Sequence, residues 1–171
     1  MRVELSTPGP ADEADFLAAM VASRELHNPW IFPPLTPEDY ADYLAKLGER
    51  KAGFIARRLD DGAIVGWLNV SEIIRGALEG AFLGYAGVAG HTGQGYMSEA
   101  LGLVLHEAFE TLGLHRVEAN IQPGNRGSIA LARRAGFKLE GFSPGYLKIA
   151  GEWRDHERWA LRAETWASPR R

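Results

Sequence analysis

A glycine-rich loop, Gly90-His91-Thr92-Gly93-Gln94-Gly95, lies between a predicted strand and a predicted helix. Glycine lets a backbone turn tightly and leaves successive N–H groups free to face a ligand. The helix that follows adds its unpaired N–H donors and the positive end of its dipole. A strand–loop–helix junction of this kind suits phosphate, so the loop predicts a pyrophosphate site. Taken alone, the same glycines also fit a purely structural turn.

Two common nucleotide-binding motifs fit this loop poorly. A P-loop has Gly-Lys-Ser/Thr before its helix, whereas this chain has Gly95-Tyr96-Met97. A Rossmann fingerprint has a third glycine where this chain has Ser98, and it opens a βαβ unit near the start of a domain. The sequence therefore predicts a phosphate-binding loop of another kind.

The elements that must position this loop follow from hydrophobic periodicity and turn residues. The predicted strands cover 2–7, 52–59, 63–74, 81–88, 115–122, 137–149 and 153–163, and the predicted helices cover 11–26, 36–47, the stretch from the loop to about 112, and 126–136. Asp60-Asp61-Gly62 is a strong hairpin signal between the second and third strands. This order predicts one central sheet with helices on both faces, an α/β (α+β) three-layer domain.

Composition excludes several classes of function. The 171 residues suit one domain, and the apolar fraction of 46% is ordinary for a globular protein. The absence of cysteine excludes disulfides, thiolate metal sites and a cysteine acyl-enzyme. His106 and His115 have no ligand spacing with other metal-binding side chains, so we expect no metal site. A net charge of −3 gives no reason to expect direct binding of nucleic acid.

The sequence on both sides of the loop indicates which kind of loop it is. Residues 84–100 (GYAGVAGHTGQGYMSEA) and 108–142 (AFETLGLHRVEANIQPGNRGSIALARRAGFKLEGF) resemble the GNAT acetyltransferase superfamily. Residues 146–161 (YLKIAGEWRDHERWAL) narrow the resemblance to its ribosomal-protein-alanine N-acetyltransferase (RimJ/RimL-like) group. The resemblance implies a single strongly twisted, mixed, mostly antiparallel sheet that is split between its fourth and fifth strands. These would be the strands at 81–88 and 115–122.

The resemblance also implies acetyl-CoA as the cofactor. Its acetyl-pantetheine arm would lie in the split along the fourth strand, and its pyrophosphate would lie on the loop. The implied contacts are Val88, Gly90, His91, Thr92, Gly93, Gln94, Gly95, Tyr96, Met97, Asn125 and Ser128. The family usually has Arg or Gln at the first position of this motif, and here it is Gly90. The loop would therefore bind mainly through its backbone, with His91 as a cationic side contact.

In this family the amine attacks the thioester directly within a ternary complex. A backbone N–H near Val88 would then stabilise the oxyanion. Ser128 is the matching residue for protonating the departing thiolate, although a first-turn hydroxyl can also simply satisfy local backbone groups. Asn125 would bind the pantetheine arm or fix the loop, and an Asn at this position is also an ordinary helix cap.

No strong base for the amine identifies itself in the sequence. Asn120 falls where some related N-terminal acetyltransferases have a glutamate. Glu118, two residues earlier on the same strand face, is the nearest carboxylate, and it is equally compatible with a surface ion pair. Trp30, Phe32 and Tyr146 are the expected walls of the acceptor site, with core packing as the alternative.

We therefore expect residues 1–166 to form a single acetyltransferase domain, with 167–171 as a short basic tail. The expected reaction is acetyl transfer to a primary amine, chiefly the N-terminal α-amine of a ribosomal protein or another peptide. A small-molecule amine is the alternative acceptor, and a non-catalytic acyl-CoA-binding module is the alternative of another class. We expect a cytoplasmic monomer or homodimer with no membrane partner, because the sequence has neither a signal-peptide pattern nor a long apolar span.

Overall fold

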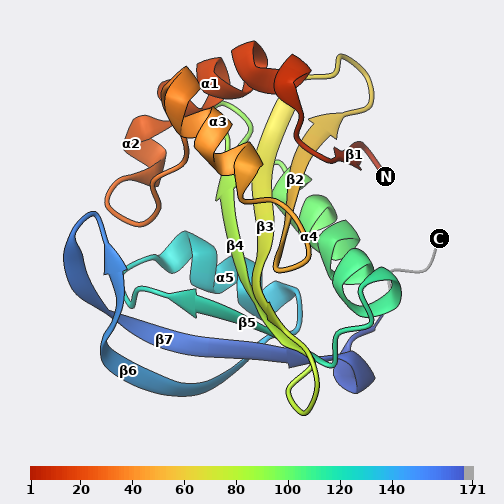
Figure 1. The fold of residues 1–171 in the computed structure, drawn as a ribbon, viewed down its shortest axis with the longest axis vertical. Coiled ribbons are helices and arrows are strands. Elements are labelled where there is room, and N and C mark those ends of the chain that lie inside the picture. Colours follow the sequence, from red (N-terminus) through yellow and green to blue (C-terminus); the bar gives the residue numbers. More distant parts are fainter. Residues whose placement is uncertain (168–171) are drawn as a thin grey trace.

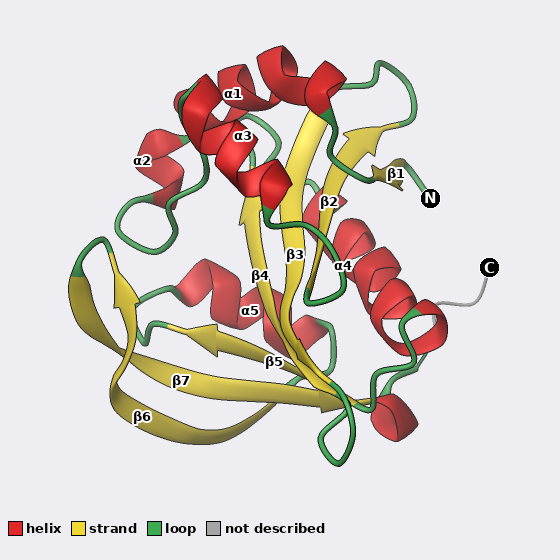
Figure 2. Ribbon diagram, viewed as in Figure 1, coloured by secondary structure: helices red, strands yellow, loops and turns green. Residues whose placement is uncertain are grey.

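The computed structural model describes residues 1–167, which form one seven-stranded sheet with helices on both faces (Figures 1 and 2). The strands are β1 (Val3–Ser6), β2 (Lys51–Arg58), β3 (Ile64–Ile74), β4 (Gly80–Gly87), β5 (Arg116–Ile121), β6 (Lys138–Ile149) and β7 (Glu152–Arg162). The helices are α1 (Glu13–Ala22), α2 (Arg24–His27), α3 (Pro37–Ala45), α4 (Tyr96–His106) and α5 (Arg126–Arg134). The predicted α/β (α+β) architecture is confirmed.

The sheet is split where the sequence predicted, between β4 and β5. Its strand order is β1-β2-β3-β4-β5-β7-β6, and every neighbouring pair is antiparallel except β4 with β5. These two strands pair only through residues 80–82 of β4 and 116–118 of β5. Beyond that point β4 runs away from β5, and Figure 1 shows the resulting V. The unpaired edge of β4 is therefore available to a ligand.

Two hydrophobic cores hold the helices against the sheet. On one face, α4 and α5 pack against the strands through side chains that include Leu101, Leu105 and Phe137, each at most 2% exposed. On the other face, α1 and α3 pack through Phe16 and Tyr40, both fully buried. Burying one such large apolar side chain is worth roughly 1.5–3 kcal/mol. The first core joins strands from both arms of the V, and the second covers only the arm that contains β2, β3 and β4.

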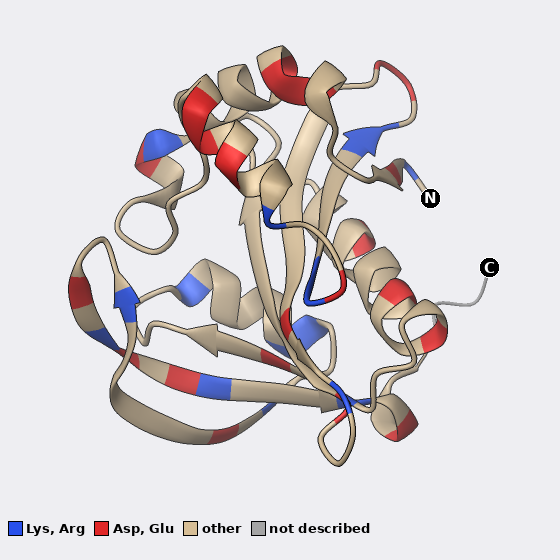
Figure 3. Cartoon of the chain, viewed as in Figure 1, with Lys and Arg blue, Asp and Glu red and all other residues tan. Residues whose placement is uncertain are grey.

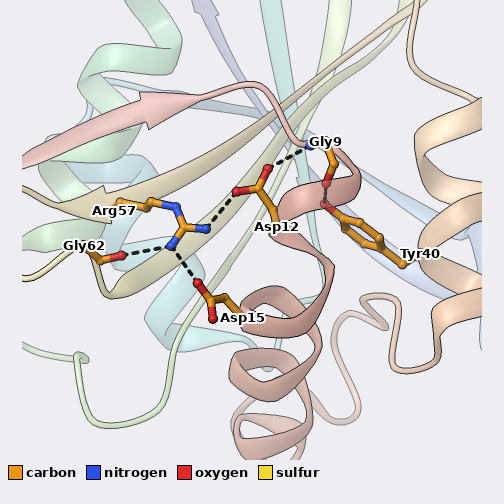
Figure 4. Close-up of polar contacts among 6 residues, drawn as sticks. All are labelled: Gly9, Asp12, Asp15, Tyr40, Arg57 and Gly62. Carbon is orange, nitrogen blue, oxygen red and sulfur yellow. Dashed lines mark hydrogen bonds and ion pairs between the residues drawn. The ribbon is translucent and has the colours of Figure 1, made fainter.

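A polar cluster fastens α1 and α3 to the strands beneath them (Figure 4). The Arg57 guanidinium of β2 donates to Asp12 Oδ1 at 2.8 Å and to the Gly62 carbonyl at 2.9 Å. The other carboxylate oxygen of Asp12 accepts from the Gly9 N–H at 2.9 Å, and the Tyr40 hydroxyl of α3 donates to the Gly9 carbonyl at 2.9 Å. These bonds fix the start of α1 and the middle of α3, and hence the segment between α2 and α3 that reaches the V.

Two of the predicted helices differ in extent from those observed. The helix predicted at 11–26 is broken at Ser23, whose hydroxyl donates to the Ala19 carbonyl at 2.7 Å and accepts from the Ala89 N–H at 2.8 Å. The long helix predicted to reach Leu112 ends as an α-helix at His106 and continues as a π-helical turn over Glu107–Thr111. In the first case a tertiary contact with the chain beyond β4 overrides the local pattern.

Of the predicted basic tail, residues 168–171 lie outside the described part of the chain. Within residues 1–167, no helix has both the length and the apolar character needed to cross a membrane. The same residues contain no group of three or more His, Asp or Glu side chains placed to hold a metal ion.

Candidate active site

A cavity of about 560 Å³ occupies the split between β4 and β5. Its walls come from α2 and the segment after it, the end of β4, the glycine loop with the start of α4, and the inner face of α5. A volume of this size is in the range of sites for cofactors and other small molecules. The cavity therefore joins the elements that the sequence predicted to act together.

The glycine loop presents a row of unpaired amides. Gly90, Gly93 and Gly95 have φ angles of 85°, 74° and 87°, a region that glycine enters without steric cost. Within the described residues, the N–H groups of residues 92–97 have no acceptor. Gly95 is the N-cap of α4, so the positive end of the helix dipole adds to these donors. The loop thus has the backbone donors and the dipole that a pyrophosphate requires.

The predicted loop residues divide between the cavity and its support. His91, Thr92, Gly93, Gly95 and Met97 line the cavity.

Gly90, Gln94 and Tyr96 do not line the cavity. The side-chain amide of Gln94 donates from Nε2 to the Gly90 carbonyl at 2.8 Å and so closes the loop. The Tyr96 ring is buried beneath Arg2 and Arg58, whose guanidinium carbons lie 4.6 and 5.5 Å from its centroid. These residues therefore shape the loop and do not face its cavity.

Arg2 supports the loop from behind. Its guanidinium donates to the Gln94 carbonyl at 2.9 Å and to Glu99 Oε1 at 2.7 Å, while its backbone N–H donates to Glu99 Oε2 at 2.6 Å. A Cβ atom added to Gly95 would lie 3.1 Å from the Arg2 guanidinium, so no side chain fits between them without a shift. Arg2 thus holds the Gln94 carbonyl on the side of the loop away from the cavity.

The amide of Val88 is already used within the sheet. It donates to the Val65 carbonyl of β3 at 3.1 Å, and the next amide, that of Ala89, donates to Ser23. The Val88 N–H itself is therefore not free for an oxyanion, and a backbone donor near Val88, as predicted, would have to come from a neighbouring residue. In an antiparallel pair the hydrogen-bonded residues alternate, so Gly87 and Tyr85 direct their backbone groups away from β3 and toward the split. Consistent with this alternation, the Gly87 carbonyl accepts from His27 Nε2 at 2.7 Å.

Tyr85 and Ser128 form a hydroxyl pair at the centre of the split. The Ser128 hydroxyl donates to the Tyr85 hydroxyl at 3.0 Å, and the Tyr85 hydroxyl donates to the Ser128 carbonyl at 3.0 Å. Asn125 caps α5 by accepting from the Ser128 N–H at 3.2 Å. Burial raises the pKa of Tyr85 to about 12, so its hydroxyl keeps its proton at neutral pH.

A second, smaller cavity of about 80 Å³ continues from this pair. Its lining shares Trp30, Ile31, Tyr85, Asn125 and Ser128 with the large cavity. The shared residues mark the place where two reactants that enter from opposite sides would meet.

The far wall of the small cavity is polar but carries no carboxylate. Asn120 contributes a side-chain oxygen and nitrogen that are both buried without a partner. His156 is 2% exposed, and its Nδ1 lies 2.9 Å from the Arg154 carbonyl. The Tyr146 ring lies 6.3 Å from the His156 ring, so this predicted acceptor residue supports the wall indirectly.

Glu118, the carboxylate predicted as a possible base, lines neither cavity. Its Oε1 accepts from Arg116 Nε at 2.8 Å, and Arg116 also binds Glu140 of β6. Glu118 lies where β5 still pairs with β4, before the strands separate. The structure thus gives Glu118 the ion pair that its sequence position also allowed, and it offers no support for a role as base.

Of the aromatic residues predicted to form the acceptor site, Trp30 and Phe32 differ in their position relative to the cavities. Trp30 lines both cavities, and a Cβ atom on Gly124 would come within 2.8 Å of its ring. Phe32 is 51% exposed and lines neither cavity, so the structure gives no support for its predicted place in the acceptor site. Sequence reasoning passed over Tyr85 and did not single out His156, because only the split and the strand register bring them together. The one available signal for His156 was its place in the polar run at 153–156.

Comparison with known proteins agrees with this geometry. Residues 2–138 match the family described as Acetyltransferase (GNAT) domain. A probable N-acetyltransferase of Bacillus subtilis, YjcK, is 40% identical over 119 residues, which are 70% of this chain and 65% of that protein. The [ribosomal protein uS5]-alanine N-acetyltransferase of Escherichia coli is 38% identical over 111 residues, which are 65% of this chain and 57% of that protein. The chain therefore matches less than two thirds of the length of both relatives.

Solved structures show the same fold. RimJ of Mycobacterium smegmatis, in complex with CoA-disulfide, is 30% identical with a TM-score of 0.86, over 95% of this chain and 82% of that one. A spermidine N-acetyltransferase of Vibrio cholerae, in complex with CoA and spermine, is 17% identical with a TM-score of 0.76, over 96% of this chain and 97% of that one. At that lower identity the second likeness concerns the fold alone.

Proposed function

Because the chain belongs to the GNAT acetyltransferase family, we propose that it transfers an acetyl group from acetyl-CoA to a primary amine, the N-terminal α-amine of a protein. One observation carries this proposal. The free edge of β4, the loop residues Thr92, Gly93, Gly95 and Met97 with their unpaired amides, and the Tyr85–Ser128 pair all line one cavity, which continues into a second, smaller one. Such a joined pair of cavities suits two reactants. One is a long acetyl donor that carries a pyrophosphate, and the other is an acceptor amine.

The residues of the large cavity fit the donor. The amides of residues 92–97 and the start of α4 would bind its pyrophosphate. The backbone groups of Tyr85 and Gly87 face the split and would bind its pantetheine arm as an added strand would. When bound, acetyl-CoA supplies an acetyl group activated as a thioester. The Tyr85 and Gly87 amides replace Val88 as the available donors to charge that develops on the acetyl oxygen.

The Ser128 hydroxyl would protonate a departing thiolate by releasing its hydrogen bond to Tyr85, whose own proton is donated to the Ser128 carbonyl. Tyr85 stays protonated across the neutral range because burial raises its pKa to about 12. Its hydroxyl and that of Ser128 exchange a hydrogen bond and lie at the junction of the two cavities. A thiol pKa of about 8.5 makes the thiolate a good leaving group, so the pair needs to contribute only modestly.

The acceptor side favours a single amine over a polyamine. No Asp or Glu of residues 1–167 lines either cavity, so several buried ammonium groups would have no counter-charge there. A peptide α-amine has a pKa of roughly 7.7–8.0 and is partly neutral near pH 7. Exposed carboxylates on α1 and α3, among them Asp15, Glu38 and Asp42, give the helices beside the Trp30 segment an acidic surface that suits a basic protein (Figure 3).

The proposal is tested by measuring the release of CoA from acetyl-CoA at pH 7.5, with short peptides of varied first residue and with spermidine. We expect turnover on peptides, with a preference for a small first residue because the second cavity is only about 80 Å³. Turnover on spermidine alone would instead assign a small-molecule amine as the acceptor. Tight binding of acetyl-CoA with no turnover on any amine would favour the non-catalytic alternative.

A further inference from the structure

His156 lies where a base for the acceptor amine is needed, given the proposed function. It comes from β7 and lines the small cavity but not the large one. Its side chain is 2% exposed, although histidine is seldom fully buried without a structural or chemical role. Its position is therefore on the acceptor side of the Tyr85–Ser128 pair.

His156 is the sole candidate among the titratable groups of the small cavity. The only other such group in its lining is Tyr85, whose pKa of about 12 makes it an acid and not a base at neutral pH. Glu118 is paired with Arg116 outside the cavity. His27 donates from Nε2 to the Gly87 carbonyl and keeps Nδ1 without a partner, but it lines the large cavity and not the small one. Imidazole is also the side chain that changes its charge between pH 5 and 8.

A backbone hydrogen bond sets the tautomer of His156. A carbonyl can only accept, so the 2.9 Å contact between Nδ1 and the Arg154 carbonyl places the proton of the neutral ring on Nδ1. Nε2 then keeps its lone pair. The same bond orients the ring, as does the edge-on contact with Tyr146. His156 is thus held in the form that can accept a proton.

No Asp or Glu of the described residues lines the small cavity beside His156. The groups that face it from neighbouring elements or share its strand face are Ser143 and Tyr146 of β6, Tyr85 of β4, Asn120 and Gln122 of β5, and Glu152, Arg154 and Arg158 of β7, where Glu152 is paired with Arg154. The adjacent Asp155 turns to the other side of the strand, where it accepts from the Gly145 N–H at 2.8 Å. The unpartnered amide of Asn120 is the polar group on β5 that remains free for the acceptor.

We propose that His156 Nε2 accepts the proton that the acceptor amine loses on acetylation. The nitrogen lone pair forms the N–C bond to the acetyl carbon, the C–S bond breaks, and its electron pair stays on sulfur. One proton passes from nitrogen to His156, and one reaches the sulfur from the Tyr85–Ser128 pair. His156 then releases its proton to solvent, and the hydroxyl pair takes up one proton from solvent. The number of protons on the protein is thereby restored.

The substitution His156→Asn tests this assignment, because the Asn amide can still donate to the Arg154 carbonyl while the base is lost. We expect kcat/KM for a peptide at pH 7 to fall by about 10²–10⁴-fold, with the Kd for acetyl-CoA unchanged. The deficit should persist above about pH 8, because an α-amine that is already neutral still loses one proton when it is acetylated. His115→Asn is the matched control, because His115 is an exposed histidine that lines neither cavity and binds Glu164.

A wild-type rate and pH profile for His156→Asn would overturn the assignment and leave the proposed function standing. No turnover by the unmodified chain on any amine would instead contradict the proposed function itself. Nitrogen NMR of the unmodified protein gives a readout that does not depend on the variant folding. We expect the neutral His156 ring to carry its proton on Nδ1, and a proton on Nε2 at pH 8 would exclude Nε2 as the base.

Discussion

At the scale of single residues, the site works through hydrogen bonds that leave particular atoms free. The Val88 amide is satisfied by β3, so the Tyr85 and Gly87 amides are the ones that face the split. The Arg154 carbonyl binds Nδ1 of His156 and leaves Nε2 free. Tyr85 and Ser128 bind each other at the junction of the two cavities. The hydrogen bonds within the protein therefore determine which donors and acceptors remain free for the reactants.

The Tyr85–Ser128 pair predicts a non-additive mutant cycle. Tyr85→Phe and Ser128→Ala should each lower kcat by roughly tenfold, because the thiolate leaves with little assistance. The double variant should lose scarcely more than the worse single variant, since the two hydroxyls act through one hydrogen bond. Steady-state kinetics and the Kd for acetyl-CoA measure this, with the Kd expected to stay constant. Multiplicative losses would mean that the hydroxyls act separately.

At the scale of elements, the loop before α4 depends on a strand that is remote in sequence. Arg2, which precedes β1, binds the Gln94 carbonyl and Glu99 of α4. The glycines allow the turn, but this contact selects which side of the loop carries the carbonyl. The geometry of the pyrophosphate site is therefore shared between the loop and the edge of the sheet.

Arg2→Ala should consequently weaken acetyl-CoA binding without unfolding the protein. We expect the Kd to rise roughly 5- to 10-fold, which corresponds to the loss of about one hydrogen bond. Arg50→Ala is the matched control, because Arg50 forms an exposed pair with Glu72 away from both cavities. Isothermal titration calorimetry distinguishes the two variants. An Arg2→Ala protein that binds acetyl-CoA as tightly as the control would show that the loop needs no support from behind.

Elements were predictable where the signal is local. The glycine loop, the helix predicted at 36–47 and the turn at 60–62 all lie close to their predicted places. The break at Ser23 was not predictable, because it depends on a bond to Ala89. The same reason explains why His156 and Tyr85 were not singled out. Their roles come from the separation of β4 from β5, which brings residues from distant parts of the sequence to one cavity.

At the scale of the whole molecule, the two cores contain tyrosines that must stay uncharged. Burial is the largest cause that raises the pKa values of Tyr40, Tyr43 and Tyr85 to about 12. Tyr40 and Tyr43 belong to the core under α1 and α3, and Tyr85 lies on the opposite face at the split. Their ionisation would place negative charge on both faces of the sheet, so stability and the shape of the site depend on the same groups.

The stability of the protein should therefore fall between about pH 10 and pH 12. Below pH 10 these hydroxyls are protonated in both the folded and the unfolded state. Between pH 10 and pH 12 they ionise only in the unfolded chain. The folded state then binds more protons, so the free energy of unfolding decreases as the pH rises. Guanidinium denaturation across this range measures the decrease. Tyr43→Phe should lessen the decrease, because it removes one of the buried hydroxyls. A midpoint that is constant from pH 10 to 12 would contradict the account.

The central claim is acetyl transfer to a peptide α-amine, and locating the acetyl group on the product tests it most directly. A peptide with a small first residue and an internal lysine would be incubated with the chain and acetyl-CoA, and tandem mass spectrometry would then find the modified nitrogen. We predict one acetyl group on the α-nitrogen and none on the lysine. An acetyl group on the lysine, or an unmodified peptide beside acetylated spermidine, would contradict the claim.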